Sequence, residues 1–381
     1  MALRGIKVIE FAGLAPAPFC GMILRDHGAS VTRIDRPGAD TNADSLSRGK
    51  RSCVIDLKNS KSASVVSRLC SNADVLIEPF RPGVMEKYKL GPSELCKINP
   101  RLIYARLTGF GQNGPFSKMA GHDINYIAIS GVLSVLGRSG EKPSPPINLL
   151  GDFAGGGLIC ALGICLALLE RQKSGKGQVI DANMVEGSAY VSSWLWTTRR
   201  EDFPIPLWAN SKGKNVLDGG SHFYQTYETK DGKYMAVGTL EPQFYKALIK
   251  GLGIDENEYS QFSDWKESTK KFSEIFLTKT QGEWCEVFNF TDACVTPVVP
   301  LEKAHKHIHN IANKSFITNE KESIPIPAPR LSRTPGNICW KIPAAGEHTL
   351  EILLEEGFTK SEIDSLVKGN VVYSASVKSS L

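Results

Sequence analysis

GIKVIEFAGLAPAPFCGMILRDHGASVTRIDR, residues 5–36, contains the pattern that decides the fold. The apolar run at 8–11 predicts a strand, 19–27 a short helix, and 31–34 a second strand. Similar strand and helix patterns follow at short spacing until a strand at 179–182. This alternation predicts an α/β fold whose parallel sheet is covered by helices on both faces.

The turn after the first strand argues against a dinucleotide site. Asp35 follows the second strand, as in a nucleotide-binding βαβ unit, but Pro16 and Pro18 stand where the glycines of GxGxxG are required. Arg36 is a separate candidate, since an arginine at the carboxyl end of a strand can hold a phosphate by a bidentate fork. The alternative is a surface arginine paired with Asp35 or Asp40.

A second domain begins after a Gly-, Pro- and Asn-rich connection at about 200–222. A strand, turn, strand pattern at 223–237 opens this domain, and Asp231-Gly232 supplies the turn. Further helices are expected at 243–251, 265–279 and 281–289. We expect 184–199 to be helical and 348–368 to be one amphipathic helix that packs on the first domain.

The composition is that of an ordinary globular protein, with 41% hydrophobic and 22% charged residues and a net charge of +5. No Lys/Arg block marks a nucleic-acid partner. The 9 cysteines are scattered singly, which indicates a reducing compartment and neither a disulfide framework nor a zinc site. His305, His307 and His309 alternate, but no cysteine or carboxylate pattern beside them supports a metal site, so none is expected.

The apolar run 153–169 is the one candidate for a membrane span. It holds three consecutive glycines and only just reaches spanning length, so we expect a buried helix and no membrane span. A strand-like run begins at Lys7, and no signal or transit peptide is expected. Ser379-Ser380-Leu381 resembles a peroxisomal tripeptide imperfectly, because Ser380 stands where a basic residue is usual.

Two residues are candidates for acid–base chemistry. Asp152 precedes the glycine triplet 155–157 and an apolar run, so it is either a helix N-cap or a catalytic acid. In the second case, N–H groups at the helix start would stabilise a developing oxyanion. His122 opens a predicted helix, where the dipole disfavours its protonated form; it is either a structural histidine or a proton acceptor.

Ordered segments along nearly the whole chain carry a family resemblance. They are Val8–Pro16, Asp35–Pro37, Arg106–Gln112, Gly121–Tyr126, Asn148–Gly157, Gly175–Asp181, Leu217–Gly220 and Glu241–Tyr245. Together they resemble the alpha-methylacyl-CoA racemases, members of the family III CoA-transferase superfamily. Several segments in order are more specific than any single motif.

The resemblance implies a Rossmann-like large domain with a parallel sheet, residues 1–200 completed by 325–381. It implies a linker and a smaller α+β domain over 201–324, and an interlocked homodimer. A CoA thioester would bind between the large domain of one chain and the small domain of the other. The family is found in peroxisomes and mitochondria, so we expect both locations.

The implied reaction is the interconversion of (2R)- and (2S)-2-methylacyl-CoA by 1,1-proton transfer through an enolate, in the oxidation of branched-chain fatty acids and bile-acid precursors. His122 would serve the 2S epimer and Asp152 the 2R epimer, while Glu241 would hydrogen-bond His122 across the dimer interface. No cofactor is implied, since CoA is part of the substrate. Contacts with CoA are implied for Arg36, Ile55, Asp56, Leu57, Lys58, Lys87, Gly121, Asp123, Ile124, Asn125 and Tyr126.

Two alternatives use the same residues differently. In the transferases of the superfamily, the residue matching Asp152 is a nucleophile that forms covalent thioester intermediates. They usually carry an aromatic residue in the position of His122, so the histidine favours the racemase. A non-catalytic acyl-CoA carrier is the third hypothesis.

Overall fold

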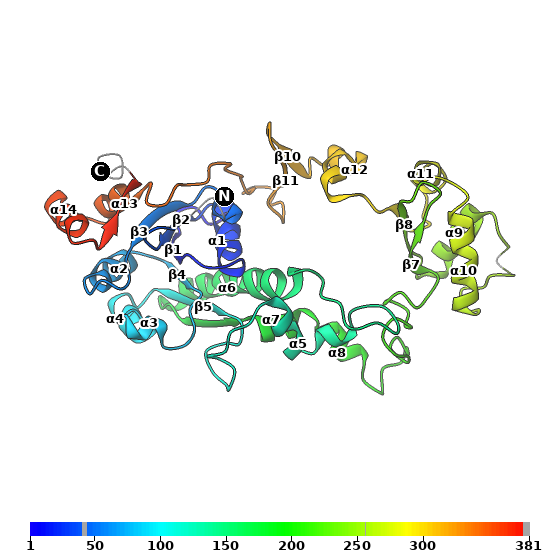
Figure 1. Ribbon diagram of the computed structural model, residues 1–381, viewed down its shortest axis with the longest axis horizontal. Helices are drawn as coiled ribbons and strands as arrows, with labels where there is room; N and C mark the ends of the chain where they lie inside the picture. The colour runs from blue at the N-terminus through cyan, green and yellow to red at the C-terminus, as the bar shows by residue number, and fades with distance from the viewer. Residues whose placement is uncertain (40–43, 256, 376–381) are drawn as a thin grey trace. The chain divides into compact units, whose positions relative to one another are not determined.

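Seven strands form the central sheet of the first of two units in the computed structural model (Figure 1). They are β1 (Lys7–Phe11), β2 (Ser30–Asp35), β3 (Arg51–Ile55), β4 (Val75–Glu78), β5 (Ile103–Thr108), β6 (Val179–Asn183) and β12 (Val372–Tyr373). Their order is β12-β3-β2-β1-β4-β5-β6. All neighbours are parallel except β12 and β3, which confirms the predicted α/β fold with a large parallel sheet.

The structure describes residues 1–39, 44–255 and 257–375. The first unit comprises 1–132, 146–192 and 326–381, and the second comprises 133–145 and 193–325. The large domain expected over 1–200 includes 133–145 and 193–200, which group with the second unit.

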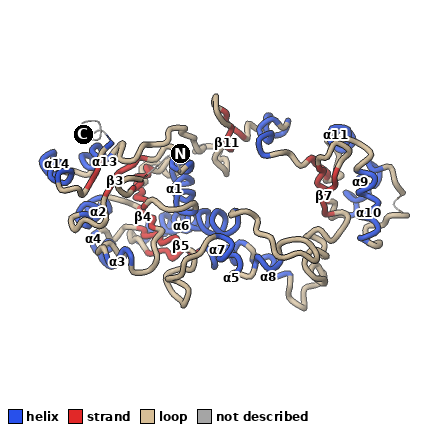
Figure 2. The backbone as a smooth tube through the Cα atoms, viewed as in Figure 1, coloured by secondary structure: helices blue, strands red, loops and turns tan. Residues whose placement is uncertain are grey.

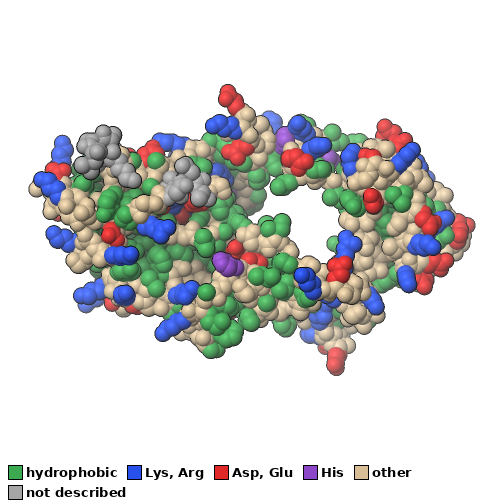
Figure 3. Space-filling view, in the orientation of Figure 1, with side chains coloured by type: hydrophobic (Ala, Val, Ile, Leu, Met, Phe, Trp, Pro, Cys, Tyr) green, Lys and Arg blue, Asp and Glu red, His purple; other side chains and the backbone are tan. Residues whose placement is uncertain are grey.

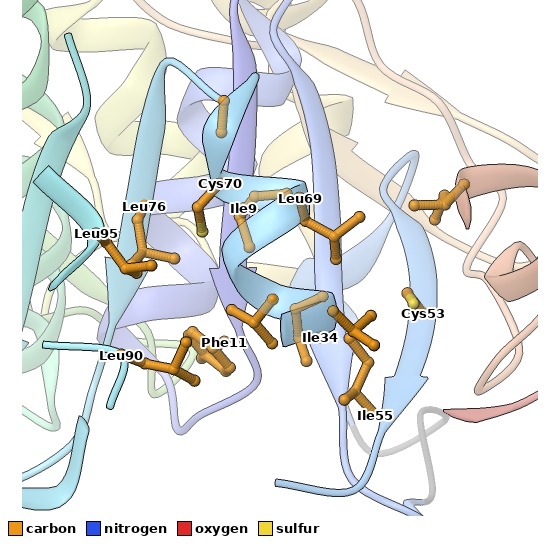
Figure 4. Close-up of a cluster of buried hydrophobic side chains, with 14 of the residues drawn as sticks. Ile9, Phe11, Ile34, Cys53, Ile55, Leu69, Cys70, Leu76, Leu90 and Leu95 are labelled. Carbon is orange, nitrogen blue, oxygen red and sulfur yellow. The ribbon is translucent and has the colours of Figure 1, made fainter. Parts of the chain in front are cut away.

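Helices cover both faces of the sheet in the first unit (Figure 2). The helical segments are α1 (Pro16–Asp26), η2 (Ser45–Ser47), α2 (Ser62–Ser71), α3 (Val84–Lys87), α4 (Pro92–Ile98), α5 (Asp123–Ile129), η4 (Leu149–Leu158), α6 (Ile159–Ser174), α7 (Met184–Val191), α13 (Thr349–Glu355) and α14 (Lys360–Lys368). Alternate strand residues point to opposite faces. Val8 therefore packs with α1 and α6, whereas Ile9 and Phe11 pack with α2, α4 and α13 (Figure 4).

The strand order creates a crevice. The chain leaves β1 toward β2 and leaves β4 toward β5, so the loops that follow β1 and β4 diverge at the carboxyl ends of the strands. Ligands bind at such a switch point in open α/β sheets. α1 begins at Pro16, and neither Pro16 nor Pro18 has an N–H group to offer a pyrophosphate, in agreement with the absence of the glycine turn.

The second unit is built around an antiparallel sheet of β7 (Tyr224–Glu228), β8 (Tyr234–Gly238) and β9 (Val295–Pro297). Its core contains Phe272, Phe276 and Trp284 from the helices packed on that sheet. Its other segments are α8 (Ser193–Thr198), α9 (Pro242–Leu252), α10 (Trp265–Phe276), α11 (Gln281–Phe288), η5 (Leu301–Lys306), α12 (Ile308–Ala312), β10 (Phe316–Thr318) and β11 (Ser323–Pro325). The short segment η3 (Val132–Val135) spans the boundary between the two units.

The single helix expected at 348–368 is wrong, since two helices, α13 and α14, occupy the segment. Gly357 lies between them with φ of +81°, a left-handed conformation that ends a helix. Thr359 then caps α14 by accepting the Glu362 N–H, while the Glu362 carboxylate accepts the Thr359 N–H. The expected helix at 184–199 is likewise divided into α7 and α8.

The helical run Leu149–Ser174 is the one described segment long and apolar enough to cross a membrane. Cys160, Ala161 and Ile164 of this run pack against β1, β4 and β5 in the core of the first unit. Acidic and basic side chains are interspersed over the face seen in Figure 3.

Candidate active site

A cavity of about 340 Å³ lies at the switch point of the first unit. The loops after β1, β4 and β5 contribute Gly13, Phe80 and Gly109 to its lining. His122 and Asp152 both line it, although 30 positions separate them in the sequence. The fold therefore brings the two acid–base candidates to one cavity.

His122 lies where its helix begins, as predicted. It is the N-cap of α5, and its backbone N–H donates to Asn125 Oδ1 at 3.0 Å. The hydroxyl of Tyr126 donates to the carbonyl oxygen of Gly121 and so fixes the residue that precedes His122. A Cβ on Gly121 would lie 2.7 Å from the Tyr126 ring, so this turn requires glycine. The His122 side chain is exposed on the cavity.

The expected role of Asp152 as a helix N-cap is wrong. The helical run begins at Leu149 with Asn148 as its N-cap, and Asp152 lies within the first, π-helical turn. The glycines around Asp152 allow this early start because they let neighbouring backbones approach closely. A Cβ on Gly155 would lie 2.5 Å from the Ser188 nitrogen, and one on Gly157 would lie 2.7 Å from the Pro16 carbonyl oxygen.

Burial raises the pKa of the Asp152 carboxyl above its ordinary value. A hydrogen bond from Asn148 Nδ2, at 3.2 Å from Asp152 Oδ2, opposes this effect on the pKa, and the nearby Asp123 carboxylate adds to it. His122 acts in the opposite direction through its charge, so the two candidates interact electrostatically. A carboxyl with a raised pKa is suited to carry a proton during part of a catalytic cycle.

Two backbone N–H groups at and before Asp152 are not free to face an oxyanion. The backbone N–H groups of Gly151 and Asp152 both donate to Asp123 Oδ2, at 2.5 and 2.7 Å. These two donors are therefore not available to the substrate, and the oxyanion role of the N–H groups that follow Asp152 stays a prediction. Asp123 lies 28 positions before Gly151, so the sequence pattern around Asp152 gives no indication of this contact.

A second cavity, of about 610 Å³, brings together the residues expected to hold the nucleotide end of CoA. Arg36 lines it with the whole segment 55–58, and it shares Gly13, Leu14 and Phe80 with the first cavity. The two cavities thus meet at the loops after β1 and β4.

The alternative ion pair between Arg36 and Asp35 is not supported, because Asp35 has other partners. The buried Asp35 carboxylate pairs with Arg33 Nε at 3.0 Å and accepts the Ser52 hydroxyl at 2.5 Å. Asp40, the other suggested partner, lies outside the described residues. The same ion pair leaves Asp35 unsuited to hold a ribose hydroxyl.

Other implied contacts are more dispersed. Lys87 is exposed at the end of α3, next to Tyr88, which lines the second cavity. Gly121 and Tyr126 line the first cavity, whereas Asp123, Ile124 and Asn125 are absent from the described lining of both. Glu241 belongs to the second unit, where it is exposed as the N-cap of α9.

Sequence reasoning missed several lining residues: Leu14, Phe80, Arg81, Tyr88, Met119 and Met184. The sequence signal for Phe80 and Arg81 is their position directly after β4, the strand that pairs with β1. Among the described residues no group of three His, Cys, Asp or Glu side chains could hold a metal ion. His305, His307 and His309 are among the residues to which this statement applies.

Comparison with known proteins gives consistent matches. The model of CoA-transferase family III matches residues 3–349. The alpha-methylacyl-CoA racemase of Mus musculus is 57% identical, over 100% of both chains. The succinyl-CoA–L-malate CoA-transferase beta subunit of Chloroflexus aurantiacus is 32% identical, over 98% of both chains. Among solved structures, Rv3272 from M. tuberculosis matches with a TM-score of 0.75 and 25% identity, over 92% of this chain and 98% of that one.

Proposed function

The chain belongs to CoA-transferase family III, and we propose that it interconverts the epimers of 2-methylacyl-CoA thioesters with His122 and Asp152 as the two acid–base groups. The observation that carries the proposal is that these two side chains line one cavity at the switch point of the sheet. The 57% identity to a racemase over the full chain supports the same reaction.

In the reaction, the Asp152 carboxylate removes the proton from carbon 2 of the 2R epimer. The electron pair of the broken C–H bond passes into the thioester carbonyl and forms an enolate. The His122 imidazolium then returns a proton to the opposite face of carbon 2, which leaves Asp152 protonated and His122 neutral. The 2S epimer reacts by the reverse sequence, and general acid–base catalysis of this kind contributes about 10²–10⁴-fold in rate.

The proposed CoA site is the second cavity. Arg36 and Lys58 are its cationic candidates for the phosphates, and Ile55, Asp56 and Leu57 line it beside them. Lys87 supplies a further positive charge without the bidentate fork of an arginine. The substrate itself carries CoA, and the mechanism assigns no step to a metal or redox cofactor.

We further propose a homodimer in which Glu241 of one chain hydrogen-bonds His122 of the other. Such a carboxylate would fix the imidazole tautomer and raise its basicity. Support for a dimer comes from a row of half-exposed leucines on one helical face: Leu158, Leu162, Leu166 and Leu169. Exposed apolar rows of this kind mark protein–protein contacts.

The double variant Leu162→Glu/Leu166→Glu is expected to be monomeric. Replacing two leucines that the proposed dimer would bury costs about 3–6 kcal/mol of association free energy, which raises the dimer dissociation constant by about 10²–10⁴-fold. Light scattering at micromolar concentration measures the change. Ile98→Glu is the matched control, since Ile98 is 50% exposed on α4 of the same unit. If the double variant stays dimeric, this helix is not part of the dimer interface.

The experiment that tests the function is proton exchange in heavy water. Either epimer of a 2-methylacyl-CoA is expected to gain one deuterium at carbon 2 and to lose its optical purity. Absence of deuterium uptake would rule out the racemase. A transferase would instead leave an acyl group on Asp152 that hydroxylamine traps. A carrier would bind the thioester with neither result.

We place the racemase in peroxisomes and mitochondria, acting on branched-chain fatty acyl and bile-acid precursor thioesters. The support is the family resemblance, and recognition of carbon 2 and CoA leaves the acyl tail open. The C-terminal tripeptide Ser379-Ser380-Leu381 lies outside the described residues. Fluorescence imaging with and without this tripeptide tests the location, and an unchanged pattern would exclude it as the peroxisomal signal.

A further inference from the structure

A buried carboxylate joins the two segments that carry the acid–base pair. Asp123, the first residue of α5, is 4% exposed and follows His122 directly. Its Oδ2 atom accepts the N–H groups of Gly151 and Asp152, at 2.5 and 2.7 Å. Asp123 is thus the chain neighbour of His122, and its side chain is hydrogen-bonded to the backbone of Asp152.

The surrounding backbone is shaped to admit this contact. A Cβ on Gly151 would lie 2.5 Å from Asp123 Oδ2 and 3.2 Å from the Asp123 Cα atom, so only glycine permits the approach. The other carboxylate oxygen, Asp123 Oδ1, is buried with no hydrogen-bond partner among the described residues. A helix cap on the surface would not require a buried carboxylate whose second oxygen is left without a partner.

We propose that Asp123 is a positioning residue of the racemase site, whose carboxylate sets the separation of His122 and Asp152 by joining the starts of α5 and η4. The proposal rests on the racemase function proposed above. It differs from the implied role of Asp123 as a CoA contact, because its carboxylate is directed to the backbone of Gly151 and Asp152.

A fixed separation is what the two-base reaction needs. The proton leaves one face of carbon 2 and another arrives on the opposite face, so both groups must reach the same carbon in one bound geometry. A displacement of about 1 Å in such a site costs about 10²-fold in rate. If the join is lost, a thioester placed correctly for one base is out of reach of the other.

The charge of Asp123 has a second effect, on the proton affinity of Asp152. Asp123 raises the pKa of the Asp152 carboxyl as a nearby like charge, and His122 lowers it. Tyr126 interacts with Asp152 as well, and burial and the Asp152 charge raise the pKa of its hydroxyl. Asp123 therefore helps Asp152 to hold the proton that it must donate to the enolate.

The variants Asp123→Asn and Asp123→Ala separate the two effects. Asparagine keeps an oxygen that can accept both N–H groups but removes the charge, so its inversion rate is expected to fall less than about tenfold. The pH at which exchange from the 2R epimer is lost should move lower, because the Asp152 pKa falls when the like charge is removed. Alanine removes the join, and inversion is expected to fall by about 10²-fold.

The decisive measurement is the ratio of inversion to deuterium exchange at carbon 2, taken for each epimer. In Asp123→Ala this ratio should fall well below that of the parent, because one base still exchanges its proton while the other is displaced. Melting temperature and the KM for the thioester are measured alongside. Asp264→Ala is the matched control, since Asp264 Oδ1 also accepts two consecutive N–H groups, of Lys266 and Glu267, at the start of α10.

The outcomes are distinct. An Asp123→Ala protein with a lower melting temperature but the parental ratio of inversion to exchange makes Asp123 a structural cap and overturns the proposal. If that variant does not fold, Asp123→Ser is measured in its place, because its shorter side chain also removes the carboxylate from the two N–H groups; the parental ratio in that variant overturns the proposal. A parent protein that exchanges no α-proton refutes the racemase function itself, and the positioning role with it.

Discussion

His122→Ala is expected to slow exchange of the α-proton from the 2S epimer by about 10²–10⁴-fold, because the base on that face of carbon 2 is lost. The 2R epimer should continue to exchange with heavy water through Asp152, without inverting, since no donor remains on the opposite face. Chiral chromatography with mass spectrometry measures inversion and deuterium content in the same sample. This asymmetry between the epimers is the signature of two bases on two faces.

A loss of folding would not explain such a result. The His122 side chain is exposed, and the contact that places it uses its backbone N–H, which alanine retains. A substitution at such a position usually changes stability by less than about 0.5 kcal/mol. The melting temperature should therefore be close to that of the parent. Equal loss of exchange from both epimers would contradict the separate assignment of His122.

The α/β class follows from the sequence because alternating apolar runs are a local property. β1, β2 and β6 lie where residues 8–11, 31–34 and 179–182 predicted strands. The break between α13 and α14 was not recognised, although Gly357 and the Thr359–Glu362 capping pair are visible in the sequence. Here a continuous amphipathic pattern outweighed a local stop signal.

The residues of the candidate site were predictable mainly from the family resemblance. His122 and Asp152 share a cavity, and Arg36 shares another with 55–58. What the sequence could not supply is the environment of Asp152. Its place inside a π-helical turn depends on glycines packed against other segments, and its N–H group is taken by Asp123, far away in the chain. Both are tertiary effects that no local pattern encodes.

The proton balance between the two bases explains why that environment matters. Ordinary aspartate and histidine side chains differ by about 2.6 pKa units, so moving a proton from an imidazolium to a carboxylate costs about 3.5 kcal/mol. In the proposed mechanism, each turnover requires both arrangements of that proton. Burial of Asp152 and the charge of Asp123 raise the pKa of its carboxyl, and so reduce this cost.

Asp152→Asn is expected to give the complementary result to the histidine variant. Exchange from the 2R epimer should fall by about 10²–10⁴-fold, while the 2S epimer still exchanges through His122 without inverting. Asparagine keeps the size of the half-buried side chain, so the fold should be retained. Asp181→Asn is the control, because the Asp181 carboxylate also accepts a hydrogen bond, from the backbone N–H of Gln112 at 3.0 Å, and lies outside both cavities.

The pH dependence gives the assignment of Asp152 an independent check. Asp152 must be ionised to take the proton of the 2R epimer, so exchange from that epimer should decline as the pH falls through the pKa of this carboxyl. Because that pKa is raised, the decline should begin at a higher pH than an ordinary aspartate would give. Asp152→Asn removes the group that produces this decline. An asparagine variant that still inverts the 2R epimer within about tenfold of the parental rate would show that another residue is the base on that face.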